Sequence, residues 1–338
     1  MRVAYGQRFD VPDGYLNTAS VGVPPDFAAD AVVRGVDRWR GGLARPPEYD
    51  EHVATARGAW ASLVGVPVER VAAGATVSQL VGLVAASLPA STRVLTVAGE
   101  FTSVSFPFAA RGMRVTEVPA ADLLDHVGEH DLVAVSVVQS ADGTVLDLDG
   151  LRAAKGTASV LLDATQAAGW LPLHLDWADW VVGSGYKWLL APRGAAWLAA
   201  TPEALERTVP FAANWYAADD PWQGIYGLPL RLAPDARRLD LSPAWFAQVG
   251  AAATLPWLAG LDLAAVRDHC TGLADAVLAA RGLPARGSAI ISLDLTEEQA
   301  GRLTAAGVVG AVRAGRTRLS FHLYNTAQDV DRVVDSTG

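Results

Sequence analysis

Lys187 is the residue best suited to covalent chemistry, because the chain contains only two lysines, Lys155 and Lys187, among its 27 basic residues. Lys187 lies in the apolar and aromatic run Tyr186–Leu190. Burial there lowers a lysine pKa, and a neutral amine can attack a carbonyl carbon to form a Schiff base, which a guanidinium cannot do. The alternative is a packed lysine stem with a solvated head. The run alone leaves both interpretations open.

Polar residues follow two strand-like runs shortly before Lys187. Asp163 and Gln166 end one run, and Ser184 ends the next. Residues beyond the carboxyl ends of parallel strands line the ligand crevice of a sheet, so Asp163, Gln166 and Lys187 should converge there. A buried carboxylate needs a cation, and a Schiff-base lysine with an acidic partner for a pyridinium nitrogen is how proteins hold pyridoxal 5′-phosphate. Capping of a strand-to-helix turn is the alternative role for Asp163.

A phosphate-binding segment is expected at residues 73–79, directly before an apolar helical pattern. Helix N-terminal amides together with the Thr76 and Ser78 hydroxyls can bind a dianion, although ordinary N-capping explains the same hydroxyls. Phe101, just past the strand-like run 94–97, offers a ring that could stack on a planar cofactor. Its alternative role is core packing.

The elements that must position these residues alternate along the chain. Strand-length apolar runs lie at 94–97, 132–138, 160–163, 180–183 and 195–198. Helical patterns lie between several of them, at 78–88 and 151–155, and another precedes them at 32–40. This alternation predicts a mostly parallel sheet with helices on both faces.

The order changes after an Ala-rich helical pattern that runs from residue 243 up to Pro256. A helix at 263–280, a strand at 289–295, a helix at 296–306, a strand pair and a helix at 326–334 follow. We therefore expect a large α/β domain over residues 15–250 and a smaller C-terminal α+β domain over residues 251–338. Residues 1–14 are expected to pack against the small domain.

Composition narrows the classes of partner. The net charge of −9 without a basic block argues against nucleic acid and membrane partners. The N-terminus lacks a signal-peptide pattern and no run of about 18 residues is fully apolar, so a cytoplasmic location is expected. A single cysteine and six histidines without ligand spacing predict no metal site. The expected partners are a small molecule and a second copy of the chain.

The spacing around Lys187 resembles the class V, cysteine desulfurase-like branch of fold-type I pyridoxal phosphate enzymes over nearly the whole chain. Asp163-x-x-Gln166 and Ser184-Gly-Tyr-Lys187 are similar to the paired motifs of that family. The resemblance implies a fold-type I transferase fold, a homodimer and an α-amino acid substrate. It also implies that Lys187 carries the cofactor as an aldimine. By the same resemblance, Asp163 would pair with the pyridine nitrogen, Gln166 with the ring hydroxyl, and Ser184, Thr76 and Val77 with the phosphate, while Phe101 would stack on the ring.

The resemblance extends to residues that would hold the substrate. Residues 318–326 are similar to the family's Arg-x-Ser-x-x-x-Tyr-Asn-Thr run, which makes Arg318 the candidate clamp for an α-carboxylate. A surface salt bridge is the alternative. Asn17 is a further implied substrate ligand. Trp215 and Tyr216, in an aromatic segment, either form a wall of the site or pack at a dimer interface.

Two departures from the family pattern bear on function. Ser242 stands where the family commonly has a Gly-Thr pair that reaches the phosphate of the neighbouring subunit, so it is a substitute for that contact. Cysteine desulfurases carry a cysteine-bearing loop before the Arg-x-Ser run, whereas here Arg313 and Arg318 are almost adjacent. The single Cys270 lies in a helical pattern, where a buried structural thiol is expected.

Persulfide transfer is therefore disfavoured. The short loop resembles the carbon-sulfur lyase members of class V, such as those that act on hercynylcysteine sulfoxide, and this predicts β-elimination from a cysteine-derived conjugate. A class V aminotransferase is the main alternative, followed by an epimerase or racemase and a noncatalytic pyridoxal-fold protein. A nicotinamide enzyme is disfavoured because no Gly-x-Gly-x-x-Gly follows a strand.

Overall fold

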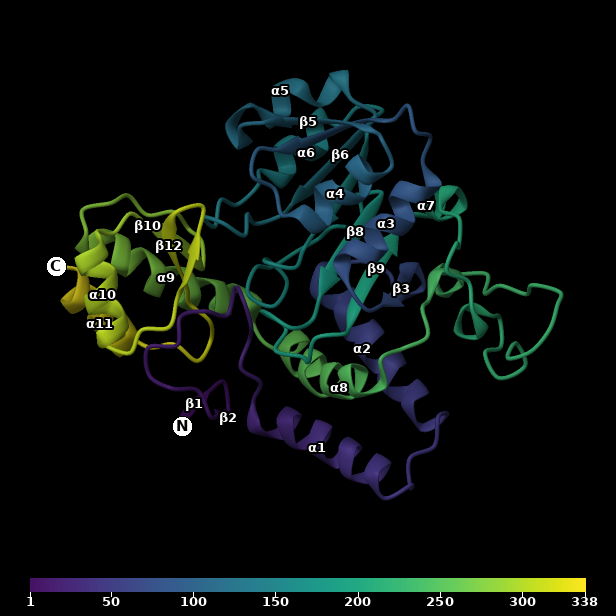
Figure 1. Ribbon diagram of the computed structural model, residues 1–338, viewed down its shortest axis with the longest axis horizontal. Coiled ribbons are helices and arrows are strands. Elements are labelled where there is room, and N and C mark those ends of the chain that lie inside the picture. The colour runs from purple at the N-terminus through teal and green to yellow at the C-terminus, as the bar shows by residue number, and fades with distance from the viewer.

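A seven-stranded sheet forms the centre of the computed structural model, which describes residues 1–338 (Figure 1). Its strand order is β3-β9-β8-β7-β6-β4-β5, and only β9 runs against its neighbours β3 and β8. The strands are β3 (Val71–Gly74), β4 (Arg93–Val97), β5 (Arg114–Val118), β6 (Leu132–Ser136), β7 (Ser159–Asp163), β8 (Trp180–Ser184) and β9 (Ala196–Ala200). The mostly parallel sheet expected from the alternating pattern is confirmed.

Helices cover both faces of this sheet. Successive strand residues point to opposite sides, so each strand contributes to the core on both faces. Leu162 and Val181 pack with helices on one face, whereas Leu161 and Val182 pack with helices on the other. The first face is covered by α2 (Glu48–Val64), α5 (Leu123–His126), α6 (Leu148–Ala154) and α8 (Trp245–Ala259). The second face is covered by α3 (Val77–Ser87), α4 (Thr102–Ala110) and α7 (Pro202–Arg207), and α1 (Asp26–Arg40) packs on α8.

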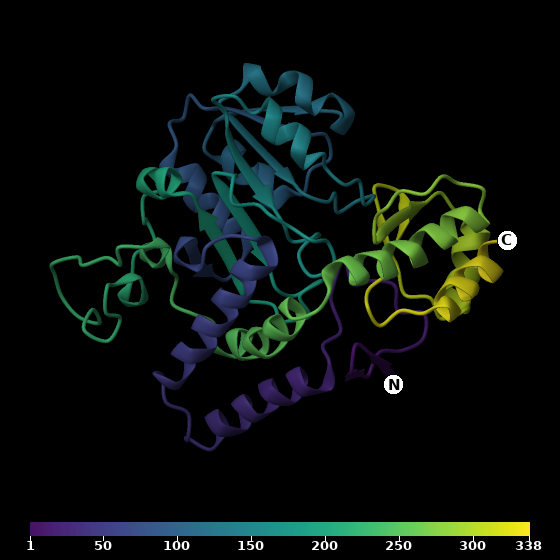
Figure 2. The same ribbon diagram turned by 180° about the vertical axis from the view of Figure 1, so that it is seen from behind.

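A smaller lobe lies at one side of the sheet and is joined to it through α8, as Figure 2 shows from behind. It is built around an antiparallel sheet of order β10-β12-β11. Its elements are α9 (Leu263–Ala280), β10 (Ile290–Leu293), α10 (Glu297–Ala305), β11 (Ala311–Arg313), β12 (Arg316–Ser320) and α11 (Ala327–Thr337). The small antiparallel C-terminal sheet agrees with the expected α+β architecture.

The N-terminal hairpin, β1 (Arg2–Ala4) and β2 (Gln7–Phe9), lies near the small lobe (Figure 1). Arg2 Nη2 donates to Asp329 Oδ1 of α11 at 2.8 Å, and its Nη1 donates to the Tyr324 carbonyl at 3.1 Å. We retain as a proposal the division into domains of residues 15–250 and 251–338, with residues 1–14 on the smaller one.

Two local expectations need correction. The helix expected to end at Pro256 continues to Ala259, because burial of Leu255 and Leu258 holds the last turn although proline supplies no N–H. The strand expected over 132–138 ends at Ser136, and Val138 instead forms an isolated bridge with Val145. No single helix is long and apolar enough to cross a membrane, and only α8 and α9 together, bent by 94°, reach the needed length and composition.

Candidate active site

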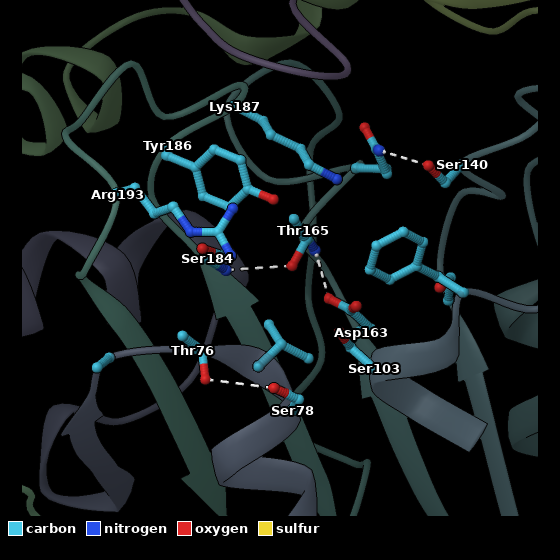
Figure 3. A pocket seen from close by; sticks show the side chains of 15 residues that line it. Thr76, Ser78, Ser103, Ser140, Asp163, Thr165, Ser184, Tyr186, Lys187 and Arg193 are labelled. Carbon is cyan, nitrogen blue, oxygen red and sulfur yellow. Dashed lines mark hydrogen bonds between the residues drawn. The ribbon is translucent and has the colours of Figure 1, made fainter. Parts of the chain in front are cut away.

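A cleft opens at the carboxyl ends of the parallel strands, where the side chains drawn in Figure 3 converge. β7 ends at Asp163, β8 ends at Ser184, and the turn after β3 leads to Thr76. The predicted residues that line this cleft are Thr76, Val77, Phe101, Asp163, Gln166, Ser184 and Lys187. Strand ends, rather than nearness in sequence, bring most of them together.

Lys187 enters the cleft with its amine next to aromatic rings. Its exposed fraction is 5%, and Nζ lies 5.2 Å from the Phe101 ring centroid and 5.6 Å from that of Tyr186. Burial lowers the pKa of Lys187 to about 8, against the opposing influence of Asp163. A substantial fraction of the amine is therefore neutral near pH 8, as nucleophilic or proton-accepting chemistry requires.

The loop that carries Lys187 is pinned at both of its ends. Gly185 N donates to the Ala195 carbonyl at 2.9 Å, and Ala191 N donates to the Gly185 carbonyl at 3.0 Å. Gly22 N also donates to the Tyr186 carbonyl at 2.9 Å, and a Cβ at Gly22 would lie 2.0 Å from the Lys187 carbonyl oxygen. The close approach explains why glycine stands at position 22, and it holds the loop against the N-terminal segment.

Asp163 is the buried acid of the cleft, with an exposed fraction of 5%. Its Oδ1 accepts a hydrogen bond from Thr165 N at 2.8 Å, and it forms no ion pair. Burial raises the pKa of Asp163 to about 6, while the hydrogen bonds from Thr165 and the charge of Lys187 oppose that rise. A carboxylate held this way is stabilised by any cation that enters the cleft.

Gln166 lines the cleft, but its amide is already bonded within the chain. Nε2 donates to the Ala19 carbonyl at 3.0 Å and to Ser140 Oγ at 2.9 Å, and Oε1 accepts from Trp188 Nε1 at 2.7 Å. Both amide protons are thus in use. The expected hydrogen bond to a ring hydroxyl stays a prediction, and it requires the bond to Ser140 to be exchanged.

Arg318 lies on β12 beside the cleft rather than in its lining, and its exposed fraction is 1%. Nη1 donates to the Ser140 carbonyl at 2.6 Å, and Nη2 donates to Ser20 Oγ at 2.6 Å. Burial, together with the nearby Arg313, lowers the pKa of Arg318 to about 10. No carboxylate contacts this guanidinium, so the alternative of a surface salt bridge is wrong. The role of Arg318 as a carboxylate clamp stays a prediction.

Replacing Arg318 by alanine should raise the Michaelis constant for amino acid substrates at least about tenfold, because it removes a buried fork that can bind a carboxylate in two places. Steady-state kinetics over a range of substrate concentrations measures the change. Arg316→Ala is the matched control, because Arg316 lies two residues earlier on the same strand and is exposed. Equal Michaelis constants in the two variants would remove the clamp role.

Four predicted residues do not line the cleft of this chain. Ser242 is exposed, and the adjacent Leu241 N bonds to the Ala73 carbonyl at 2.9 Å. Asn17 lies outside the lining, with a buried Oδ1 that has no hydrogen-bond partner. Tyr216 lies outside the lining and donates to Asp50 Oδ1 at 3.1 Å, and Trp215 lines a different cavity. Trp215 and Tyr216 therefore lie outside the cleft lining of one protomer, and their role as a substrate wall stays a prediction.

Several lining residues were missed by the sequence reasoning. They are Ser103, Ser136, Ser140, Thr165, Tyr186 and Arg193. Nearness to Lys187 in sequence could have indicated Tyr186 and Arg193, which the same loop carries. Ser140 had no such signal, because it is brought to the cleft by the chain path after β6.

The arrangement suits one kind of cofactor. The cleft combines a buried amine, a buried carboxylate without a cation, and hydroxyl groups at the N-terminus of α3. A planar aldehyde with a basic ring nitrogen and a phosphate group matches this set, and pyridoxal 5′-phosphate has all three parts. No group of three or more His, Cys, Asp or Glu is placed to hold a metal ion.

Comparison with known proteins agrees with this assignment. A family model described as aminotransferase class-V matches residues 111–281. An uncharacterized aminotransferase of Bacillus subtilis, YcbU, is 29% identical over 318 residues, which are 85% of this chain and 84% of that protein. Isopenicillin N epimerase of Streptomyces clavuligerus is 30% identical over 278 residues, which are 72% of this chain and 66% of the epimerase.

Solved structures show the same fold at lower identity. The cystine C-S lyase C-DES, in complex with cysteine persulfide, superimposes with a TM-score of 0.84 at 18% identity, over 96% of this chain and 97% of that one. A cysteine desulfurase of Thermococcus onnurineus gives 0.82 at 17% identity, over 96% and 93%. The cofactor is pyridoxal 5′-phosphate, and the chain belongs to the aminotransferase class-V family of enzymes that use it.

Proposed function

We propose that the protein is a carbon-sulfur lyase that expels a sulfur leaving group from Cβ of a cysteine-derived amino acid. The observation that carries this proposal is the lack of any thiol able to accept sulfur at the site. The single cysteine, Cys270, is 0% exposed within α9, and burial raises the pKa of its thiol. A buried thiol with a raised pKa is a poor nucleophile.

The hairpin between β11 and β12 leaves no place for a cysteine-bearing loop. Arg313 pairs directly with Arg316 across the turn, and only Ala314 and Gly315 lie between them. Both turn residues have positive φ, 47° and 76°, as the tightest hairpins require. Chemistry that ends with sulfur on an enzyme cysteine is therefore disfavoured.

The side chains of the cleft supply the remaining needs of an elimination. Bound pyridoxal 5′-phosphate supplies a carbonyl for the substrate amine and a ring that withdraws electrons from Cα. Asp163 is ionised above its pKa of about 6, so it can hold a protonated ring nitrogen at neutral pH. The Lys187 amine, with a pKa of about 8, is placed to take the proton from Cα.

Loss of the Cα proton to Lys187 allows the Cβ–S bond to break, and the sulfur leaves with the bonding electrons as a thiolate. The remaining three-carbon fragment reacts with water and yields pyruvate and ammonia. Burial of the Lys187 amine, in a residue that is 5% exposed, keeps bulk water from the proton before it is transferred. A noncatalytic role is disfavoured, because it would leave the buried Lys187 and Asp163 without a purpose that offsets their cost.

A second candidate is an α-amino acid aminotransferase, which is favoured by the relative named as an aminotransferase that matches most of both chains. An epimerase is favoured less, because the similarity to isopenicillin N epimerase covers a smaller share of both chains. All three reactions begin with the same proton transfer to Lys187. They differ in the atom, or the face of Cα, that next receives a proton, or in whether a leaving group departs first.

Product analysis separates the three reactions. The purified holoenzyme is incubated with cystine, S-alkylcysteines and cysteine sulfoxides, and in parallel with alanine and glutamate. We expect pyruvate, ammonia and a free thiol or related sulfur product from the sulfur compounds. A keto acid that keeps its side chain, with pyridoxamine phosphate on the enzyme, would establish transamination. Inversion at Cα with uptake of solvent deuterium would establish epimerisation.

We also propose that the working unit is a homodimer. Residues 208–241, which follow α7, extend away from the sheet as an arm (Figure 1). This arm exposes large apolar side chains, among them Phe211, Leu228 and Leu230. Ser242 follows this arm, so its expected contact with the phosphate of a neighbouring subunit belongs to the same proposal. Sedimentation velocity measures the mass of the holoenzyme directly.

A further inference from the structure

We propose that Arg193 binds the phosphate of pyridoxal 5′-phosphate through its guanidinium, from the same loop that carries Lys187. The proposal rests on the cofactor assignment and is independent of which reaction follows. Arg193 would add a positive charge to a phosphate site that otherwise consists of hydroxyl groups and backbone amides of the same chain.

Arg193 lies beside those hydroxyls. Figure 3 shows its guanidinium extending toward Ser184, above the turn that holds Thr76 and Ser78. Thr76 Oγ1 accepts from Gln79 N at 3.3 Å as the N-cap of α3, and it lies 3.4 Å from Ser78 Oγ. The backbone N–H of the buried Ser184 donates to Thr165 Oγ1, and its hydroxyl makes no hydrogen bond, which leaves the hydroxyl for a ligand.

The guanidinium of Arg193 is not committed to another group of the protein. Its Cζ lies 5.1 Å from the Tyr186 ring centroid, and it forms no ion pair. The contrast is with Arg57, whose guanidinium is bonded to Asp240 at 2.6 and 2.9 Å. A guanidinium that is held in orientation by a ring and keeps its donors free is suited to bind a planar pair of phosphate oxygens.

Charge balance gives the second reason. Lys187 and Arg193 are the only cationic residues that line the cleft. Lys187 is engaged in carbonyl and proton chemistry, and its Nζ lies on the Tyr186 ring that Arg193 also contacts. A phosphate dianion leaving water needs a cation or several strong donors. Arg193 is the one cation of the lining that remains for it.

The loop geometry makes the two roles compatible. Lys187 and Arg193 are both held between Gly185 and Ala195, whose backbone groups are bonded at 2.9 Å. Gly194, directly after Arg193, has φ of +116°, a conformation that favours glycine and sets the direction in which the chain leaves the loop. One closed loop can therefore hold both the carbonyl end and the phosphate end of a cofactor.

The competing explanation is structural: Arg193 could serve only to pack on Tyr186 and so support the loop. Pyridoxal, which lacks the phosphate, separates the two explanations. A phosphate ligand changes the affinity for pyridoxal 5′-phosphate but not for pyridoxal. A supporting residue changes both alike.

The test uses apo-protein of the wild type and of Arg193→Ala, Arg193→Lys and Arg207→Ala, titrated with each compound and followed by visible absorbance. We expect Arg193→Ala to weaken pyridoxal 5′-phosphate binding about tenfold or more, which is about 1.4 kcal/mol per factor of ten, and to change pyridoxal binding less than about twofold. Arg193→Lys should recover part of the loss. Arg207→Ala is the matched control, because Arg207 stacks 5.0 Å above Trp180 outside the cleft.

A second measurement needs no cofactor. Inorganic phosphate should raise the melting temperature of the wild-type apo-protein and of Arg207→Ala, and raise that of Arg193→Ala much less. If Arg193→Ala does not fold, Arg193→Gln keeps the length of the side chain and answers the same question. Equal weakening of both compounds, or unchanged pyridoxal 5′-phosphate binding, overturns the proposal. A wild type that binds neither compound would overturn the cofactor assignment instead.

Discussion

Replacing Lys187 by alanine should remove the visible absorbance of the bond between the lysine and the cofactor, shifting the spectrum of any cofactor still bound, and should lower turnover by at least about 10³-fold. The amine is the only group of the cleft that can bond covalently to an aldehyde, and general acid-base catalysis alone contributes about 10² to 10⁴. Its pKa of about 8 leaves a substantial fraction of the amine neutral near pH 8. Absorbance spectra and initial rates measure the two losses.

The chain offers a control of the same residue type. Lys155 is the only other lysine, and it lies away from the cleft, 3.3 Å from Asp179. Borohydride reduction of the holoenzyme followed by peptide mass analysis should place the cofactor on Lys187 alone, and Lys155→Ala should keep full absorbance. Label on the Lys155 peptide, or an unchanged spectrum in Lys187→Ala, would contradict the assignment of Lys187.

Lys187 should also make the free energy of unfolding of the apo-protein depend on pH. Because its folded pKa of about 8 lies below the ordinary lysine value of 10.5, the unfolded chain binds the proton more tightly between these values. The free energy of unfolding therefore rises as pH increases from about 8 to 10.5, by an amount on the order of 3 kcal/mol. Lys187→Ala should lack this rise in urea unfolding, whereas Lys155→Ala should keep it.

Replacing Asp163 by asparagine should separate function from stability. Without the carboxylate a ring nitrogen is no longer held in its protonated form, so we expect turnover to fall by about 10² to 10³-fold, the loss typical of one strong electrostatic contact. The same change should stabilise the apo-protein at neutral pH. Initial rates and urea unfolding of the same preparations measure both effects.

The direction of the stability change follows from the pKa of Asp163. Its folded pKa of about 6 lies above the ordinary aspartate value of 3.8, so the folded state binds the proton more tightly. The free energy of unfolding therefore has its full contribution from Asp163 below about pH 4. This contribution falls as pH rises through 6, and the loss by pH 7 is on the order of 3 kcal/mol. Asparagine removes that loss, so the two proteins should differ at pH 7 and converge near pH 4.

Asp163→Glu tests the catalytic half of this expectation, because it keeps the carboxylate and should retain more activity than asparagine. Asp131→Asn is the control for stability. Asp131 is exposed and is paired with Arg93 at 2.7 Å, and that guanidinium lowers its pKa to about 2, so its loss should not stabilise the protein. Equal unfolding curves for the wild type and Asp163→Asn at pH 7 would show that burial does not raise this pKa.

The parts of the site that could be predicted are those whose position follows from one strand. Asp163 and Ser184 stand directly at the ends of β7 and β8, two continuous buried runs, and the sheet alone determines that they face one cleft. β3 escaped notice, because Val71–Gly74 is short and rich in small residues. α8 passes Pro256 because burial outweighs one missing hydrogen bond, and a local rule does not include that term.

The parts that could not be predicted depend on partners distant in sequence. Tyr216 is hydrogen bonded to Asp50, 166 residues earlier, and lies outside the cleft lining. The amide of Gln166 is occupied by Ala19, 147 residues earlier, which no motif indicates. Arg193 faces the cleft because Gly185 and Ala195 close its loop, and this requires β8 and β9 to pair first. The sequence indicates which residue types are present, but it does not indicate which of their hydrogen-bonding groups already have partners.

Arg2 contacts Asp329, and Ser20 contacts Arg318, so parts of the enzyme that are made first must wait for residues that are made last. These partners are separated by 327 and 298 residues, so at about 5 to 20 residues per second the ribosome makes the second member tens of seconds after the first. The Gly22 contact with Tyr186 can form earlier, since it needs no residue of the small lobe. The loop bearing the reactive amine is thus braced during synthesis, and the wall around Arg318 is added last.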